Sequence, residues 1–588
     1  MTILCFPVKA RGILRSKTSR QRGAKICLAA AFLSLSVMNL AGATNEALAI
    51  RLNTVGYLPL AEKQASIATP CTNFAIIRVA DGSTVLDGKV TGPVLNEDTQ
   101  ERLYTADFSA VTQPGDYQLE VPGAGRSAPF RIAPDVYREP YQTAMLGFYL
   151  WRCGTAVSAT YHGETFAHDA CHTNDAWLDL VGGGHVRKDG TKGWHDAGDY
   201  NKYTVNAGLA VGTLFRAWED FGPQISKVGL QIPESGGKLP DFLAEVKWEM
   251  DWVLTMQAAD GSVYHKVSTK RFGPFIMPEK ETDPRYFTPW GSEATAHFVG
   301  MTAQAARIFR PYDRAFANRC LKAAKKSYKF LQAHPEFHRA DPAGVHTGTY
   351  EIRETGESSH RLNGIPNNRL WAAAELWETT GSREALRDLE TRIRAVNGQV
   401  NFQFDWDEVK DLGLMTYLSS QRSGRDPALV ALVRSNLLAV ADETVQTAHE
   451  HGYACPIGSR HGWGYNGFVA RQTMVLMAAD RLTCTNGVPG KPEYRATCQD
   501  ALNYLFGRNY YCRSFVTGVG FRPPMHPHDR RSAADNIVDP WPGYLVGGPN
   551  DKATDWKDDQ KDARSNEIAI NWNAALVYAL AACLPNPE

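Results

Sequence analysis

The sequence lacks the features that define several protein classes. Its 588 residues carry 63 cationic and 63 anionic side chains, so the formal net charge is zero. Zero net charge argues against a nucleic-acid partner held by bulk electrostatics. Cysteine is scarce: two of the 11 cysteines fall within residues 1–43, and the other nine are an odd number that does not form a simple disulfide framework. The ordinary composition, 43% hydrophobic and 21% charged, excludes disorder, collagen and a coiled coil as the main architecture.

Long hydrophobic runs are also missing. Residues 1–43 contain seven cations and no carboxylate, and the apolar run 26–41 is followed by small residues. This order is typical of a secretory signal peptide, cleaved after residue 43 or as late as residue 49. The alternative is a membrane anchor, but Asn39 and two serines interrupt a run already shorter than the ~20 residues that a span needs. Without the leader, 56 cations remain against 63 anions, a net charge of −7.

Residues 50–134 are predicted to form a small β-sandwich. Alternating or apolar runs such as 74–79 and 117–121 are separated by turn signals, among them Asp81-Gly82 and Pro114-Gly115-Asp116. Short strands at roughly ten-residue spacing are typical of an immunoglobulin-like outline, although the Cys…Trp…Cys core of antibody domains is missing.

From residue 135 to residue 588 the hydrophobic period becomes helical, and the segments 239–254 and 298–308 each place their apolar residues on one face. We expect about eleven or twelve helices, the last near 566–582. The loops between them are long, and such loops in a compact domain are usually functional. We therefore expect the chemistry in loops 185–200, 258–292, 451–465 and 509–565.

Two segments carry candidate catalytic carboxylates. In 194–200, Asp196 and Asp199 stand three residues apart in a glycine-containing loop before a helix, where helix-start amides favour the ionised form. In 565–576, Glu567 opens a strongly apolar helix. The structural alternative for each is a helix cap, because acidic residues are common at helix starts.

A third segment, 514–530, combines glycines and hydroxyl groups with His528 and Arg530. Such a set can hydrogen-bond a polyhydroxylated ligand. Alternatively, these side chains satisfy one another within the loop.

Together these segments resemble glycoside hydrolase family 9, the cellulase family with an (α/α)6 barrel. Residues 196–199 are similar to its Asp-Ala-Gly-Asp loop, 514–530 to its histidine signature and 556–574 to its acid signature. Residues 53–57 are similar to the immunoglobulin-like module that precedes the barrel in one branch of the family. The resemblance implies a mainly α fold: an (α/α)6-barrel catalytic domain over 135–588, preceded by a small immunoglobulin-like β-sandwich.

The chain departs from the family pattern near Glu567. The family usually has an aromatic residue where this chain has Ala563, and commonly Asp-Tyr where it has Asn571-Trp572. These changes leave the reaction type intact but leave open the substrate and the endo or exo mode.

The resemblance implies hydrolysis of β-1,4-glucosidic bonds with inversion. Inversion needs one protonated and one ionised carboxyl group on opposite faces of the ring, roughly 6.5–9.5 Å apart. By resemblance, Glu567 is the general acid, Asp199 the general base and Asp196 a second holder of the water, while His528 and Arg530 hold sugar hydroxyls. Apolar neighbours of Glu567 should raise the pKa of its carboxyl.

Aromatic residues make up 10% of the chain and include 14 tryptophans. Their faces can stack on sugar rings, although many aromatics belong to the core. Those in or beside the motif loops are candidate cleft residues: Trp463, Tyr465, Tyr203 and Trp290.

Cys153, Cys171, His172 and His195 form a candidate Cys2His2 set for tetrahedral zinc. The spacing is not that of a zinc finger, and a Cys153–Cys171 disulfide is the alternative in a secreted protein. Cellulases that share the N-terminal module carry a structural zinc at matching positions, so the resemblance implies zinc here.

Family members also often bind calcium, and Ser235, Asp241 and Glu245 lie in an oxygen-rich loop and helix start. The alternative is a solvated helix N-terminus, since calcium needs six to eight oxygen ligands. No organic cofactor is expected.

The leading hypothesis is a secreted, monomeric endo-β-1,4-glucanase. The alternatives are an exo-acting β-glucosidase or cellobiohydrolase, an exo-β-glucosaminidase, and, more distantly, a non-catalytic carbohydrate-binding protein. No linker or further module follows the last predicted helix, so we expect better action on soluble or amorphous glucan than on crystalline cellulose.

Overall fold

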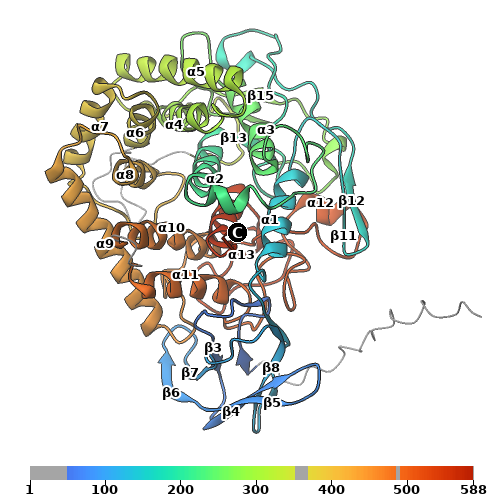
Figure 1. The fold of residues 1–588 in the computed structure, drawn as a ribbon. Coiled ribbons are helices and arrows are strands. Elements are labelled where there is room, and N and C mark those ends of the chain that lie inside the picture. Colours follow the sequence, from blue (N-terminus) through green and yellow to red (C-terminus); the bar gives the residue numbers. More distant parts are fainter. Residues whose placement is uncertain (1–48, 351–367, 485–489, 587–588) are drawn as a thin grey trace, which may run out of the picture. The chain divides into compact units, whose positions relative to one another are not determined.

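The computed structural model describes residues 49–350, 368–484 and 490–586. The predicted leader, residues 1–43, lies outside these ranges. A β-rich module comes first, and helices make up most of the rest, as the sequence predicts (Figure 1). Within the described ranges, no helix is long and apolar enough to cross a membrane.

The N-terminal module is a sandwich of two sheets. The first sheet has the order β1-β3-β7-β6, with bounds Ile50–Arg51, Gln64–Ile67, Glu101–Asp107 and Thr91–Asn96. The second has the order β2-β10-β8-β4-β5, with bounds Gly56–Tyr57, Phe130–Ile132, Gly115–Val121, Asn73–Arg78 and Thr84–Lys89. A further short strand, β9 (Gly125–Arg126), pairs with β8. Along β8, Tyr117, Leu119 and Val121 are buried and alternate with more exposed residues, so one face covers the module's core.

Polar contacts join this module to the helical part. The amide of Asn53 donates to the Asn503 side chain and to the Tyr137 hydroxyl, both at 3.0 Å. The main-chain N–H of Thr54 donates to the carbonyl oxygen of Phe506 at 3.1 Å.

Twelve helices of ten or more residues build the helical part in the described ranges. They are α1 Arg138–Leu150, α2 Thr204–Ile225, α3 Asp241–Thr255, α4 Ser292–Ile308, α5 Arg314–Ala333, α6 Asn368–Thr380, α7 Arg383–Ala395, α8 Lys410–Ser419, α9 Pro427–Glu450, α10 Tyr465–Thr483, α11 Pro492–Leu505 and α14 Ile570–Ala581. Shorter elements complete the chain: α12 Arg530–Ala534, α13 Ala563–Asn566, the 3-10 turns Asp179–Val181 and Pro278–Lys280, and strands β11 Val157–Tyr161, β12 Glu164–His168, β13 Lys202–Tyr203, β14 Lys266–Ser268 and β15 Tyr286–Phe287.

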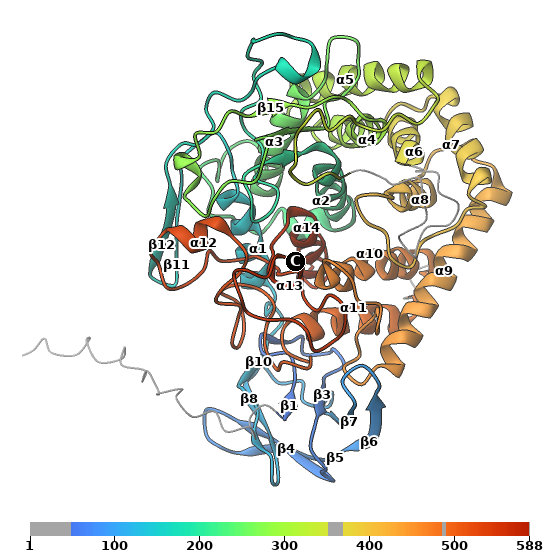
Figure 2. The ribbon, with the colours of Figure 1, turned by 180° about the vertical axis from the view of Figure 1, so that it is seen from behind.

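Alternate helices form an inner ring, and the others surround it. Helix α2 packs on α4, α4 on α6, α6 on α8, α10 on α14, and α14 back on α2. Helices α1, α3, α5, α7, α9 and α11 lie outside this ring, and the two views of the ribbon show α9 along its edge (Figures 1 and 2). The predicted (α/α)6 barrel is therefore confirmed.

The sequence of each helix accounts for its layer. Every residue of α14 is buried, and the helix is apolar over most of its circumference, as an inner helix requires. In α7 the buried residues are Ala385, Leu386, Leu389 and Ile393, a single stripe typical of a helix that covers a core on one side.

The last predicted helix differs from the observed structure. The sequence places Glu567 at the start of a helix near 566–582, but α13 ends at Asn566 and α14 begins only at Ile570. Residues 567–569 are extended, because the backbone of Glu567 pairs with His528 and that of Ile568 with Val546. Glu567 therefore lies in an extended segment between two helices and belongs to neither.

Candidate active site and metal centre

One cavity of about 720 Å³ brings together the predicted catalytic residues from both ends of the helical part. Asp196, Asp199 and Glu567 line it, together with His528 and Arg530. The motif segments therefore meet in space although more than 300 residues separate them along the chain.

The loop 196–199 is held by backbone hydrogen bonds. The N–H of Asp196 donates to the carbonyl oxygen of Asn201 at 3.0 Å, and the N–H of Ile570 donates to the carbonyl oxygen of Asp196 at 2.9 Å. The second bond ties the loop directly to the start of α14, three residues beyond Glu567. The carboxylates consequently have fixed positions relative to one another.

Asp199 accepts two hydrogen bonds. The N–H of Asn201 donates to Oδ1 at 2.8 Å, and the hydroxyl of Tyr203 donates to Oδ2 at 3.1 Å. Burial raises the pKa of Asp199, while the charge of Arg530 and these two hydrogen bonds act against that rise.

Asp196 is more deeply buried and is held by two side chains. The amide of Asn206 donates to Oδ1 at 2.9 Å, and the hydroxyl of Tyr350 donates to Oδ2 at 2.7 Å. Burial, and then the neighbouring charge of Asp199, raise the pKa of Asp196 to about 8. The sequence predicts that helix-start amides favour the ionised form, but the carboxylate of Asp196 is held by two side chains and its removal from water outweighs these polar contacts.

The pKa of Glu567 is raised, as are those of the two aspartates. The protein around it removes the carboxyl from bulk water, and Asp199 and Asp196 add negative charge nearby, so its pKa lies well above the usual value. A hydrogen bond from the Gly198 backbone opposes this rise. The prediction of a raised pKa is confirmed, with the two aspartates as an additional cause.

His528 and Arg530 have different environments. Nδ1 of His528 lies 2.7 Å from the carbonyl oxygen of Gln560, and the ring packs edge-on against Phe275 with a centroid distance of 5.2 Å. Arg530 is 4% exposed and donates from Nη1 to Oε1 of Glu281 at 3.1 Å. The guanidinium is thus already engaged by a buried carboxylate.

Two of the four predicted cleft aromatics line the cavity. Trp463 is 52% exposed, and Tyr203 is buried with its hydroxyl on Asp199. Tyr465 is 1% exposed and donates its hydroxyl to the carbonyl oxygen of Gly458, so it belongs to the core. Trp290 stacks on His338 at 3.9 Å and is not among the described residues that line the cavity. These two predictions are corrected: nearness in sequence to a motif does not determine which way an aromatic side chain points.

Several lining residues were not predicted. Tyr350, Trp406 and Asp405 come from loops without a motif, and Phe272 and Phe275 come from a loop predicted to be functional only as a whole. No sequence signal marks them, because their role depends on which loops meet at the mouth of the barrel.

The departures from the family pattern also lie in the cavity wall. Ala563, Asn571 and Trp572 all line the cavity. The amide of Asn571 donates to Asp405 at 3.2 Å, and Asp405 pairs with the buried Arg471 at 3.3 Å. The positions that distinguish this chain are thus in reach of a bound ligand.

The four predicted zinc ligands form one cluster. One ligand atom from each of Cys153, Cys171, His172 and His195 lies within 4.8 Å of the others. Sγ of Cys153 is 3.7 Å from Nδ1 of His172, and Sγ of Cys171 is 3.6 Å from Nε2 of His195. These separations suit the edges of a tetrahedron with metal–ligand bonds of about 2.0–2.3 Å.

The alternative disulfide is absent. The nine described cysteines, Cys153 and Cys171 included, are free thiols. Two thiols and two imidazoles that converge on one point fit a structural zinc.

Each predicted calcium ligand already has a protein partner, and the hydroxyl of Ser235 donates to the carbonyl oxygen of Leu230. Glu245 is fully buried and accepts from the guanidinium of Arg152 at 2.8 Å and from Nε1 of Trp194 at 2.9 Å. Asp241 accepts from the N–H of Leu230 at 2.9 Å. Because an arginine already neutralises Glu245, we do not propose calcium at these residues.

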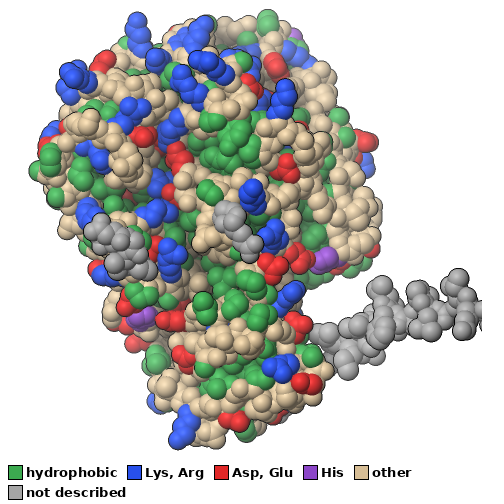
Figure 3. All heavy atoms as spheres, in the orientation of Figure 1, with side chains coloured by type: hydrophobic (Ala, Val, Ile, Leu, Met, Phe, Trp, Pro, Cys, Tyr) green, Lys and Arg blue, Asp and Glu red, His purple; other side chains and the backbone are tan. Residues whose placement is uncertain are grey.

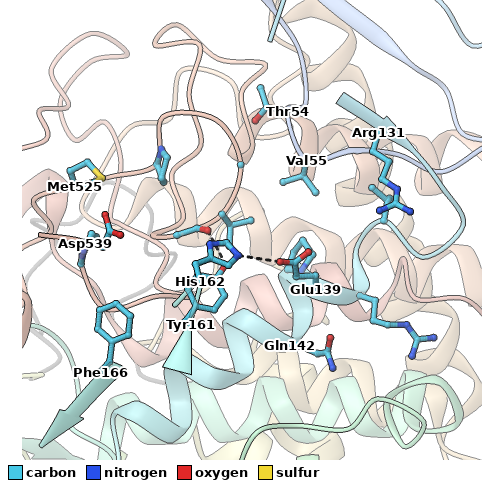
Figure 4. A pocket seen from close by; sticks show the side chains of 18 of the residues that line it. Thr54, Val55, Arg131, Glu139, Gln142, Tyr161, His162, Phe166, Met525 and Asp539 are labelled. Atoms are coloured by element: carbon cyan, nitrogen blue, oxygen red, sulfur yellow. Dashed lines mark hydrogen bonds and ion pairs between the residues drawn. The ribbon is translucent and has the colours of Figure 1, made fainter. Parts of the chain in front are cut away.

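A second cavity, of about 550 Å³, lies where the N-terminal module meets the helical part (Figure 4). It is lined by Val55, Tyr161 and Phe166, and His162 pairs with Glu139 at 3.5 Å. None of the predicted catalytic residues lines it.

On the face drawn in Figure 3, cationic and anionic side chains are interspersed, in keeping with the near-balanced composition.

Comparisons with known proteins agree with this architecture. The family model described as glycosyl hydrolase family 9 matches residues 137–580, and the model described as cellulase N-terminal ig-like domain matches residues 45–126. Endoglucanase D of Acetivibrio thermocellus is 52% identical over 534 residues, which cover 90% of this chain and 83% of that protein. Cellodextrinase of Butyrivibrio fibrisolvens is 33% identical, with 91% and 99% covered. The crystal structure of a metagenome-derived glycoside hydrolase family 9 endoglucanase has a TM-score of 0.83 at 33% identity, with 91% and 99% covered.

Proposed function

Because the chain belongs to glycoside hydrolase family 9, we propose that it cuts β-1,4-glucan chains at internal bonds, as an endo-β-1,4-glucanase. The observation that carries this proposal is the cavity in which Asp196, Asp199 and Glu567 lie with the exposed Trp463. The similarity to a protein named endoglucanase D over most of both chains supports the same substrate class.

The three carboxyl groups are assigned roles by their environments. Glu567, whose pKa is raised by burial and by the nearby charges of Asp199 and Asp196, is the acid that gives its proton to the departing glycosidic oxygen. Asp199, with the charge of Arg530 nearby, is the ionised base that takes a proton from the attacking water. Asp196 faces the same water and is oriented by Asn206 and Tyr350.

Attack by water on the face opposite the leaving group inverts the anomeric carbon. The β-linked substrate then yields an α-configured product first. Proton NMR of the earliest products tests this step, and a first product in the β configuration would contradict inversion.

Two further groups are assigned to substrate binding. Nδ1 of His528 is committed to a backbone carbonyl, so Nε2 is left to accept a hydrogen bond from a sugar hydroxyl. The half-exposed ring of Trp463 offers a flat apolar face to a glucose unit. Arg530, by contrast, acts through its charge on Asp199 and does not need to contact the sugar.

We also propose that Cys153, Cys171, His172 and His195 hold a structural zinc. Four protein ligands complete a tetrahedral shell, so no position stays open for substrate or water. When bound, the ion would supply a cross-link between the loops that carry these residues. Since His195 precedes Asp196, that cross-link would brace the loop that carries both aspartates.

The basic and apolar pattern of residues 1–43 supports export before the enzyme meets its substrate. A glucan polymer does not enter cells, so an exported enzyme is consistent with a polymeric substrate.

Viscometry on a soluble cellulose derivative separates endo from exo action. An endo enzyme lowers viscosity quickly while few reducing ends form. An enzyme that trims chain ends releases many reducing ends before viscosity falls, and the similarity to a protein named cellodextrinase makes this the result to exclude. A parallel time course on a chitosan hexamer tests the glucosaminidase alternative.

A further inference from the structure

Glu281 lies between the Cys2His2 cluster and the wall of the catalytic cavity. Its Oε2 is 3.2 Å from Nε2 of His172, and its Oε1 accepts from Nη1 of Arg530 at 3.1 Å. The carboxylate is 3% exposed, so both contacts are shielded from water. A single side chain therefore contacts a member of each site.

On the metal side, Glu281 contacts His172 in the way that a carboxylate supports a metal-binding histidine. His172 turns Nδ1 toward Sγ of Cys153, which leaves Nε2 pointing away from the cluster, toward Glu281. Histidines that bind metals usually donate their second ring N–H to a carboxylate or carbonyl, which orients the ring and strengthens it as a ligand. Glu281 is placed to accept that bond.

On the cavity side, the contact fixes a charge beside Asp199. The groups that face Asp199 are the carboxyls of Asp196 and Glu567, the hydroxyl of Tyr203 and the guanidinium of Arg530. A guanidinium free to move would pair directly with an aspartate and weaken it as a base. Here Nη1 is engaged by Glu281.

The backbone also restrains both partners of this ion pair. A Cβ atom at Gly273 would lie 2.8 Å from Oε1 of Glu281, so the loop at 273 closes over the carboxylate. The main-chain N–H of Arg530 donates to the carbonyl oxygen of Gly198 at 3.3 Å, which ties α12 to the aspartate loop.

We propose that Glu281 is a positioning residue that orients His172 in the metal cluster and holds Arg530 beside Asp199, so that the cluster and the catalytic loop keep one arrangement. The kinetic part of this inference rests on the proposed role of Asp199 as the base. The metal part does not depend on it.

The first measurement needs no substrate. Zinc is titrated away from the full-length protein with a chromogenic chelator, for the wild type and for Glu281→Gln. Loss of the charged acceptor should weaken zinc binding about 10–100-fold. The matched control is Glu375→Gln, because Glu375 is equally buried and pairs with Arg307 but does not line the cavity. The control should bind zinc as the wild type does.

The second measurement is the pH profile of kcat/KM on a soluble glucan. The charge of Glu281 raises the pKa of Asp199, so its removal should move the acid limb of the Glu281→Gln profile to lower pH. Glu281→Asp should restore part of the wild-type profile, and Glu375→Gln should leave it in place even if the protein is less stable.

The outcomes are distinguishable. Unchanged zinc affinity in Glu281→Gln, a wild-type protein that binds no zinc, or an unmoved acid limb would each overturn the role of Glu281. Failure of the wild type to hydrolyse any glucan would overturn the proposed function instead, and the zinc titration would still decide whether Glu281 supports the cluster.

Discussion

Gly198 packs so closely against His528 that a Cβ atom at residue 198 would lie 2.1 Å from the His528 carbonyl oxygen. The glycine is required for space, and it lets two segments that are 330 residues apart in the sequence form one wall of the cavity. Through this contact the aspartate loop is held beside the strand-like segment of Glu567, whose backbone pairs with His528.

Gly198→Ala should therefore separate the two segments. We expect the free energy of unfolding to fall by about 1–3 kcal/mol, as is typical of overpacking. We also expect a large fall in kcat, because Asp199 and Glu567 would no longer have the relative positions that catalysis needs. Thermal unfolding and kcat on a soluble glucan measure the two effects. Gly462→Ala is the control, since a Cβ there meets no atom within 4 Å, and a similar loss in both variants would contradict the argument.

The carboxyl groups can be tested by isosteric substitution. Glu567→Gln and Asp199→Asn should each lower kcat by about 10²–10⁴-fold or more, because each removes one proton-transfer group. The far-ultraviolet circular dichroism should stay unchanged. Asp551→Asn, at an exposed carboxylate outside the cavity, is the control. Near wild-type hydrolysis by either variant would disprove its assigned role.

Arg530 should set the pH at which the base ionises. Its positive charge lowers the pKa of Asp199, so Arg530→Met should raise that pKa. The base must be ionised to act, so the acid limb of kcat/KM should move to higher pH, opposite to the shift expected for Glu281→Gln. A profile that keeps its acid limb while KM alone rises would instead support direct contact between Arg530 and the sugar.

Zinc removal should expose two reactive thiols. Metal analysis after dialysis should find about one zinc per chain, and strong chelation should lower the unfolding temperature, since a bound ion stabilises the folded state. Thiol titration before and after chelation should then differ by Cys153 and Cys171. If both cysteines stay unreactive until a reductant is added, a disulfide, and not zinc, joins them.

Trp463 should contribute to binding and not to the chemical step. Trp463→Ala should raise KM for a long glucan about tenfold, equivalent to ~1.4 kcal/mol, with little change in kcat. Because the side chain is half exposed, stability should change little. Tyr312→Ala, at an exposed aromatic outside the cavity, should leave KM unchanged. A large fall in kcat for Trp463→Ala would assign the ring to the reaction itself.

The sequence by itself determined the mainly α architecture, the β-rich module before it, the three carboxylates and the four cluster residues. The hydrophobic period distinguishes helices from strands. The order of several spaced motifs carries the family resemblance, and that resemblance assigns the carboxylates and the cluster residues. Tertiary structure alone decided the rest. It broke the last helix at Glu567 by backbone pairing with His528, and it raised the pKa of Asp196 by burial. It also placed Tyr350 and Glu281 against the site while turning Tyr465 into the core. These features depend on which distant loops meet at the mouth of the barrel, and no residue's near neighbours in the sequence carry that information.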